Sequence, residues 1–297
     1  MTGTPSRNSA TLIGFSAVLL WALLALFTAA SGKVPPFQLA AMTFAVGGSI
    51  GLVPMLRRPQ MFRQLRQPWQ VWLLGVGGLF GYHFFYFTAL RNAPPVEAGL
   101  VAYLWPLLIV IFSALLPGEK LKPHHLLGAL LGLLGAGLIV TAGQGVSFRA
   151  EYGIGYGAAL VCALTWSGYS VLSRRFSAIP TAAVTGFCLV TAVLAAICHV
   201  LLEQTVWPAT PLQWAATLGL GLGPVGLAFY AWDHGVKHGD IQVLGAASYS
   251  APLLSTVILI GTGIAAFTPT VAIACVLITA GAVIAARDML FRRRRLA

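Results

Sequence analysis

Tyr103-Leu104-Trp105-Pro106-Leu107-Leu108 and Tyr249-Ser250-Ala251-Pro252-Leu253-Leu254 each place a proline within an apolar run, and the two prolines lie 146 residues apart. The same offset brings Gly135-Ala136 onto Gly281-Ala282. Internal repeats of this kind show that one structural unit occurs twice in a chain. The two stretches therefore predict a protein built from two related halves.

The composition excludes a soluble fold. Of the 297 residues, 58% are hydrophobic and only 8% are charged, whereas soluble domains are roughly half apolar and a quarter charged. A helix needs about 20 apolar residues to cross the bilayer, whereas barrel strands alternate over about 10. The continuous apolar runs between charges and prolines predict ten spanning helices, at residues 10–31, 36–56, 69–90, 94–116, 124–142, 153–173, 181–202, 212–233, 241–264 and 268–286.

Each half of the chain holds five of these helices. Because five is an odd number, the second half must enter the membrane from the side opposite to the first. We therefore predict an all-α integral membrane protein with ten transmembrane helices in two inverted five-helix repeats, residues 1–145 and 146–297. In transporters of this design the substrate site lies near the membrane midplane, at the interface of the repeats.

The positive charges predict how the chain is oriented. The net charge is +11, but the lysines and arginines stand in short clusters between apolar runs, which is a topological pattern and not a nucleic-acid-binding face. One side collects fifteen of them: Arg7, Arg57, Arg58, Arg63, Arg66, Lys120, Lys122, Arg174, Arg175, Lys237, Arg287 and Arg292 to Arg295. The other side holds three: Lys33, Arg91 and Arg149. This asymmetry predicts a multi-pass protein of the cell inner membrane with both termini in the cytoplasm.

Polar and aromatic residues near the middle of the spans are candidates for binding a small-molecule substrate, because such groups are costly in the bilayer. The candidates are Tyr82, His83, Tyr86, Tyr103, Trp105, Trp166, Tyr169, Ser248 and Tyr249. Tyr103 and Trp105 are two residues apart and point in nearly opposite directions on a helix, so only one faces the centre unless a kink turns both. At this point the alternative, that these side chains only pack the helices, stays open.

Pro106 and Pro252 are predicted hinges. A proline inside a helix has no amide hydrogen to donate and releases the carbonyl four residues before it, here those of Ala102 and Ser248. Such carbonyls either face a polar cavity or mark a kink that only shapes the bundle. Tyr230, Asp233 and His234 share a helix face at the end of the eighth run. We interpret them as an interfacial, solvated cluster, and the alternative is a gate.

The sequence predicts no metal, no cofactor and no catalytic residue. Hydrolysis within a membrane needs paired aspartates, an H-E-x-x-H helix or a serine and histidine in facing spans, and only the last can be assembled here, from Ser248 or Ser250 with His83. A channel is disfavoured because no charged ring or filter-like loop stands out. A transporter is therefore favoured over both.

The chain resembles the drug/metabolite transporter superfamily, whose ten-helix members consist of two fused five-helix halves. The resemblance rests on the mid-helix prolines, the paired Gly-Ala positions, Gly14 through Ala22, and Gly118-Glu119-Lys120. The second half departs from it, with Gly261-Thr262-Gly263 in place of a Gly-Glu pair.

Within that superfamily, Gly81-Tyr82-His83 and the stretch from Tyr103 to Pro106 resemble the bacterial aromatic amino-acid exporters. This likeness implies export of amino acids, including aromatic ones, by alternating access through an aromatic-lined cavity that Trp105 faces. The alternative within the superfamily is export of other small organic or drug-like metabolites.

Overall fold

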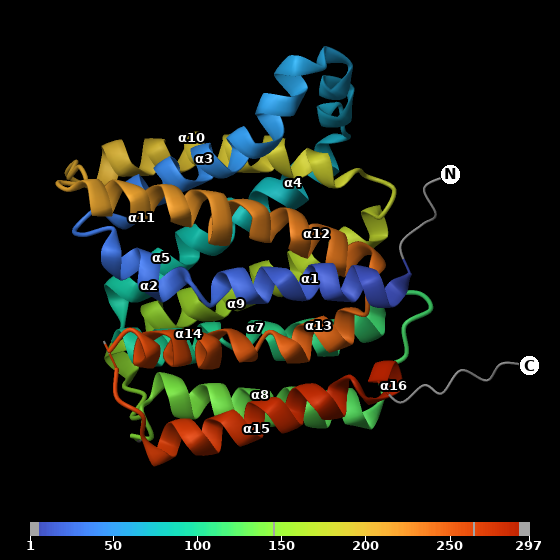
Figure 1. Ribbon diagram of the computed structural model, residues 1–297, viewed down its shortest axis with the longest axis vertical. Coiled ribbons are helices and arrows are strands. Elements are labelled where there is room, and N and C mark those ends of the chain that lie inside the picture. The colour runs from blue at the N-terminus through green and yellow to red at the C-terminus, as the bar shows by residue number, and fades with distance from the viewer. Residues whose placement is uncertain (1–5, 145, 264, 291–297) are drawn as a thin grey trace, which may run out of the picture.

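The computed structural model describes residues 6–144, 146–263 and 265–290, which form helices joined by turns and loops (Figure 1). The helices in chain order are α1 Arg7–Trp21, α2 Leu24–Ala30, α3 Pro36–Arg57, α4 Trp69–Val76, α5 Tyr82–Asn92, α6 Pro95–Ala102, α7 Trp105–Phe112, α8 Pro123–Val140, α9 Gly153–Ser173, α10 Val184–Leu202, α11 Pro211–Leu222, α12 Ala228–His238, α13 Ile241–Ala247, α14 Ser250–Gly261, α15 Pro269–Ala285 and α16 Arg287–Leu290.

Eight helical segments in the described part of the chain are long and apolar enough to cross a membrane. They are Arg7–Ala30, Pro36–Arg57, Trp69–Asn92, Pro95–Leu115, Pro123–Val140, Thr181–Leu202, Pro211–His238 and Ile241–Gly261. Helix α9 has 21 residues but is enriched in polar and aromatic side chains, and the apolar helix α15 has 17 residues. The all-helical membrane fold predicted from the sequence is therefore confirmed.

Four of these segments carry irregularities that recur between the two halves. The segment that contains Pro106 breaks between α6 and α7, and the segment that contains Pro252 breaks between α13 and α14. Single π-helical turns interrupt two other segments, at Gly77–Gly81 and Gly223–Leu227. Proline and π turns are the usual causes of sharp helix kinks. The first residues of the two π turns are separated by 146 residues, the same offset as the prolines.

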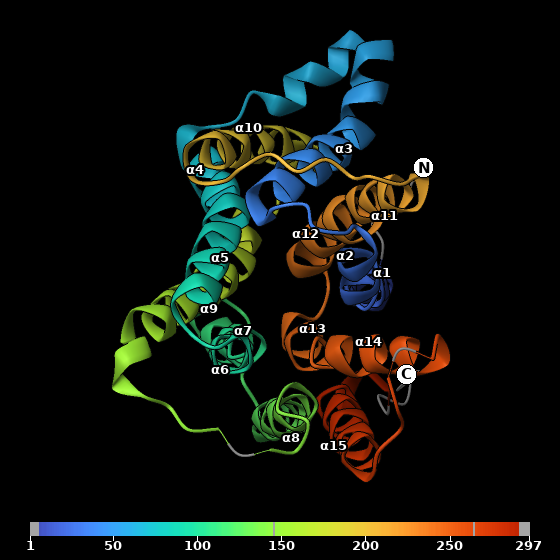
Figure 2. The ribbon, with the colours of Figure 1, turned by 90° about the vertical axis from the view of Figure 1, so that its left-hand side faces the viewer.

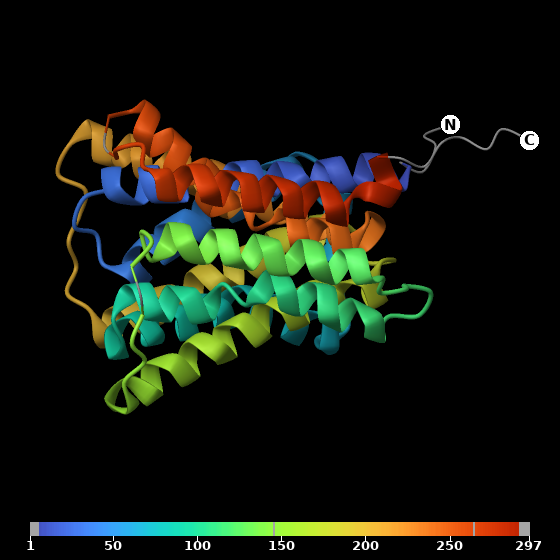
Figure 3. The same cartoon turned by 90° about the horizontal axis from the view of Figure 1, so that it is seen from below.

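Helices from the two halves pack directly on one another. The main pairs are α8 with α15, α3 with α10, α1 with α12, and α5 with α9, and Figure 2 shows the first two pairs side by side along the helix axes. Helix α1 begins, and α16 lies, at one end of the bundle, which we call the terminal end (Figures 1 and 3). The loop between α10 and α11 lies at the opposite end (Figure 1).

Glycines allow α1 and α12 to touch. A Cβ atom added to Gly235 would lie 2.4 Å from the Cα of Gly14, a separation that real Cβ atoms do not show. Gly235→Ala is therefore expected to lower the melting temperature in detergent, because overpacking a tight contact costs about 1–3 kcal/mol. The matched control is Gly157→Ala, since an added Cβ there meets open space. Equal melting temperatures for the two variants would contradict this account of the contact.

Candidate functional site

Seven aromatic side chains meet where the two halves join, and we call them the central aromatic cluster. They are Trp21, Tyr82, Trp105, Trp166, Tyr169, Phe229 and Trp232. Trp166 lies at the hub, with ring centroids 5.3 Å from Tyr169, 5.5 Å from Tyr82, 5.7 Å from Phe229, 5.8 Å from Trp21, 6.2 Å from Trp232 and 6.3 Å from Trp105. These separations fall in the range in which aromatic rings attract one another.

Helix α5 adds a half-buried row of side chains to this cluster. Tyr82 and Tyr86 stack with ring centroids 6.0 Å apart, as their spacing on one helix face predicts. His83 packs against Phe44 at 5.0 Å, and its Nδ1 atom donates to the carbonyl of Leu79 at 2.8 Å. Because Nδ1 must carry the proton to donate, Nε2 of a neutral His83 ring is left as an acceptor.

The structure distinguishes Trp105 from Tyr103. Trp105 is buried and packs in the central aromatic cluster, with its ring 5.9 Å from that of Trp232. Tyr103 is half-buried at the break between α6 and α7. In this conformation Trp105 is therefore the member of the pair that packs in the central aromatic cluster.

Ser248 and Tyr249 lie outside the central aromatic cluster. Tyr249 is fully buried in a second cluster with Val110, Ala129 and Ala136. Its hydroxyl oxygen accepts from the amide of Leu107, at 3.1 Å, next to Pro106. The Ser248 hydroxyl donates to the carbonyl of Leu244, at 2.7 Å. In this conformation both residues therefore brace the helix breaks, and contact with a substrate stays a prediction for them.

Sequence reasoning missed Trp21, Phe229 and Trp232. Trp21 ends α1, and its indole nitrogen donates to the carbonyl of Pro224, at 3.1 Å, within the second π turn. Trp232 is fully buried, and its indole nitrogen donates to the hydroxyl of Ser170, at 3.0 Å. The sequence alone does not distinguish a tryptophan that packs between helices from one that lines a binding site. The available signal was a Phe-Tyr pair that occurs in both halves, as Phe85-Tyr86 and Phe229-Tyr230, and it points to Phe229.

A cluster of ion pairs lies at the terminal end of the bundle. The Glu119 carboxylate, 7% exposed, lies 2.9 Å from the Arg7 guanidinium and 2.5 Å from that of Arg174. Arg7 also lies 3.3 Å from Asp240. Burial lowers the pKa of Arg174, and the neighbouring Glu119 raises it. We call these four residues, which come from both halves of the chain, the terminal ion cluster.

The environment of Asp233 shows that its interpretation as part of a solvated, interfacial cluster is wrong. Asp233 is not solvated, because its side chain is 2% exposed and lies 2.9 Å from the ammonium of Lys237, itself 4% exposed. The helix continues to His238, past the end predicted at residue 233. A lysine one turn after the aspartate compensates its charge, so the helix buries both residues.

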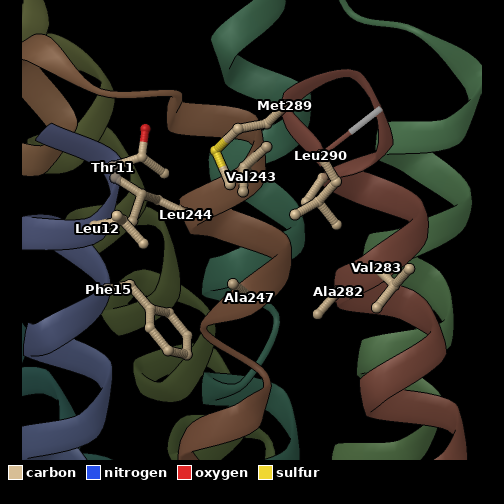
Figure 4. Close-up of a pocket in the computed structure, with 11 residues that line it drawn as sticks. Thr11, Leu12, Phe15, Val243, Leu244, Ala247, Ala282, Val283, Met289 and Leu290 are labelled. Carbon is tan, nitrogen blue, oxygen red and sulfur yellow. The ribbon is translucent and has the colours of Figure 1, made fainter. Parts of the chain in front are cut away.

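An apolar pocket lies near the terminal end between α1, α13, α15 and α16 (Figure 4). It has a volume of about 220 Å³, and Thr11 is the one polar residue among those described that line it. Such a lining has no charged group to fix the ends of a polar solute. In a membrane this groove suits lipid chains.

The fold and the central site define a membrane transporter. The chain belongs to the EamA-like transporter family, whose model matches residues 8–141 and 153–287. This confirms the resemblance to the drug/metabolite transporter superfamily, and the chain is accordingly a transporter and not an enzyme.

Individual relatives agree with this membership. The chain is 58% identical over 281 residues to the aromatic amino acid exporter YddG of Ancylobacter novellus, covering 94% of this chain and 98% of that protein. It is 26% identical to the protein of the same name from Escherichia coli, over 84% of this chain and 87% of that one. A crystal structure 56% identical in sequence matches it with a TM-score of 0.90, over 97% of this chain and 100% of that chain.

Proposed function

We propose that this protein exports amino acids, aromatic ones included, through the central aromatic cluster by alternating access of its two halves. The observation that carries the proposal is that six aromatic side chains, contributed by both halves, surround Trp166. Aromatic faces stack on an aromatic solute, and indole and hydroxyl groups bond its polar atoms. The name of the Ancylobacter novellus relative supports the same substrate class.

The architecture behind this function is proposed to be ten transmembrane helices in two inverted repeats, residues 1–145 and 146–297. Aligning the halves equates α1 with α9 and α5 with α12. The packing of α1 on α12 then corresponds to that of α9 on α5, and both contacts are made. The recurring proline breaks and π turns support the same symmetry. Two related halves around one site are what alternating access requires.

We also propose that the protein lies in the cell inner membrane with both termini in the cytoplasm. The support for this orientation is the excess of positive charge at the terminal end, where α3 ends at Arg57, α9 is followed by Arg174, and α12 carries Lys237 in its last turn. The terminal end is then the cytoplasmic one, and the terminal ion cluster closes the cytoplasmic side.

The residues proposed to contact the substrate are those predicted from the sequence. Tyr82, His83, Tyr86, Trp105, Trp166 and Tyr169 lie in or beside the central aromatic cluster. Tyr103, Ser248 and Tyr249 flank the helix breaks, and we propose that they reach the substrate when the halves rock about hinges at Pro106 and Pro252. No cofactor or metal is assigned a role.

Uptake of radiolabelled tryptophan, phenylalanine and threonine into liposomes that contain the purified protein tests this function. Saturable flux is expected. Trp105→Ala should reduce the flux of tryptophan more than the flux of phenylalanine or threonine, since aromatic contacts contribute about 0.5–1.5 kcal/mol each. Trp207→Ala is the control, because Trp207 is 61% exposed. Absence of flux for every amino acid would point to another solute, as the 30% identity to the pseudopaline exporter CntI of Pseudomonas aeruginosa over 67% of this chain suggests.

A further inference from the structure

The buried pair Asp233 and Lys237 stands between the terminal ion cluster and the central aromatic cluster. We propose that it is a binding station for the two charged ends of a zwitterionic amino acid that arrives from the terminal end. This inference rests on the proposed function and names a site for it that adjoins the central aromatic cluster at Tyr169.

Both members of the pair have their hydrogen bonds satisfied within the protein. The Lys237 ammonium lies 2.9 Å from both carboxylate oxygens of Asp233 and donates to the carbonyl of Ile179 at 3.0 Å. The Thr181 hydroxyl donates to Asp233 at 2.7 Å. One buried cation and one buried anion therefore lie side by side with hydrogen-bond partners of their own, which keeps the cost of burying them low.

A small pocket adjoins the pair. Its volume of about 10 Å³ is lined by Asp233, Lys237, Tyr169, Ser173 and Phe187, among other residues. This is about the space that one water molecule needs. The Tyr169 hydroxyl is buried there beside the Ser173 side chain, and it makes no hydrogen bond of ordinary geometry in the described part of the chain. An unmatched buried hydroxyl is costly unless water or a ligand bonds it.

The pocket leads to the central aromatic cluster. The ring of Tyr169 lines the pocket and lies 5.3 Å from that of Trp166. On the terminal side, Arg174 donates to the carbonyls of Val236 at 2.9 Å and Gly239 at 2.8 Å, which holds the end of α12 against the end of α9. Release of these bonds would open the pocket toward the terminal end.

A zwitterion can exchange with this pair without leaving a charge uncompensated. Its ammonium takes the place of Lys237 at Asp233, and its carboxylate takes the place of Asp233 at Lys237. Phe187 and Tyr169 then offer aromatic faces to the side chain. A solute with only one charge leaves either Asp233 or Lys237 unpaired, and an unpaired buried charge is strongly unfavourable. The station therefore selects zwitterions over amines and acids.

The test uses inside-out membrane vesicles, which present the terminal end to the medium under the proposed topology. For the unaltered chain, tryptophan should compete with labelled tryptophan far better than tryptamine or indole-3-propionate, which each carry one charge. The double variant Asp233→Asn/Lys237→Met removes both charges at similar volume. We expect it to raise the KM for tryptophan at least about tenfold and to lose the preference for the zwitterion.

Two further variants complete the test. Asp233→Lys/Lys237→Asp keeps one charge of each sign and should keep the preference for the zwitterion. Arg149→Gln/Glu151→Gln, which neutralises an exposed pair at 2.8 Å, is the control and should leave KM unchanged. An unchanged KM in the neutral double variant, or equal competition by tryptamine in the unaltered chain, would overturn the station while leaving the proposed function intact. Failure of the unaltered chain to transport any aromatic amino acid would refute the proposed function itself.

Discussion

Glu119→Gln is expected to expose the pocket beside Asp233 and Lys237 to water from the terminal end. The Glu119 carboxylate is the anion that Arg7 and Arg174 share, and it is almost completely buried. Removing one partner of a fully buried ion pair costs about 3–5 kcal/mol, and the cost here is smaller because the side chain of Arg7 is 48% exposed and that of Arg174 is 18% exposed. That energy is lost from the conformation in which the terminal end is closed, so the population of the open conformation should rise about tenfold or more.

Alkylation of a cysteine at position 173 measures this opening. Ser173 is 3% exposed and lines the pocket, so Ser173→Cys reports on its accessibility. The four native cysteines would first be replaced by serine or alanine, and a membrane-impermeant maleimide would be added on the terminal side. The reaction is expected to be at least about tenfold faster with Glu119→Gln than without it.

Glu151→Gln serves as the control for this prediction, because Glu151 also pairs with an arginine but is 58% exposed. Exposed ion pairs contribute little, so the alkylation rate should not change. If Glu119→Gln also left the rate unchanged, the terminal ion cluster would not hold that end closed, and the closure would have to come from helix packing alone.

The sequence defined the helices well because charges and prolines limit them. The predicted run 153–173 coincides with α9, and 36–56 differs from α3, Pro36–Arg57, by one residue. The predicted eighth run ends at residue 233, whereas the helix in the structure continues to His238. Hydropathy treats Asp233 and Lys237 as two separate costs, whereas in the folded chain each cancels the charge of the other.

The candidate site was predicted less completely, since it depends on how each helix is rotated about its axis. Tyr82 and Trp166 stood out because polar and aromatic groups are unusual at mid-span. Trp21 and Trp232 could not be separated from packing residues by the same reasoning. Tyr249 resembles Tyr103 in its sequence context, yet the packing of α13 on α7 and α8 turns it into a different cluster. Such differences arise from tertiary contacts that no local pattern encodes.

Trp166→Ala is expected to raise the KM for tryptophan more than any other single truncation in the central aromatic cluster. Trp166 contacts six aromatic rings, and each such contact contributes about 0.5–1.5 kcal/mol beyond the area it buries. Truncating a buried tryptophan also leaves a cavity that costs about 3–5 kcal/mol. These losses should lower the melting temperature, and because the truncation also removes an aromatic face that the cluster offers the substrate, KM should rise by up to about tenfold.

Two variants separate substrate binding from stability in this prediction. Trp166→Phe keeps an aromatic face and should recover most of the affinity with a smaller loss of stability. Trp214→Ala removes one ring of the exposed stack with Trp207, at 6.1 Å, and should leave the KM unaltered. If Trp166→Ala lowered the melting temperature but left the KM of the folded fraction unchanged, Trp166 would support the junction of the halves without touching the substrate. The binding site would then have to be assigned to Tyr86 and His83 on α5.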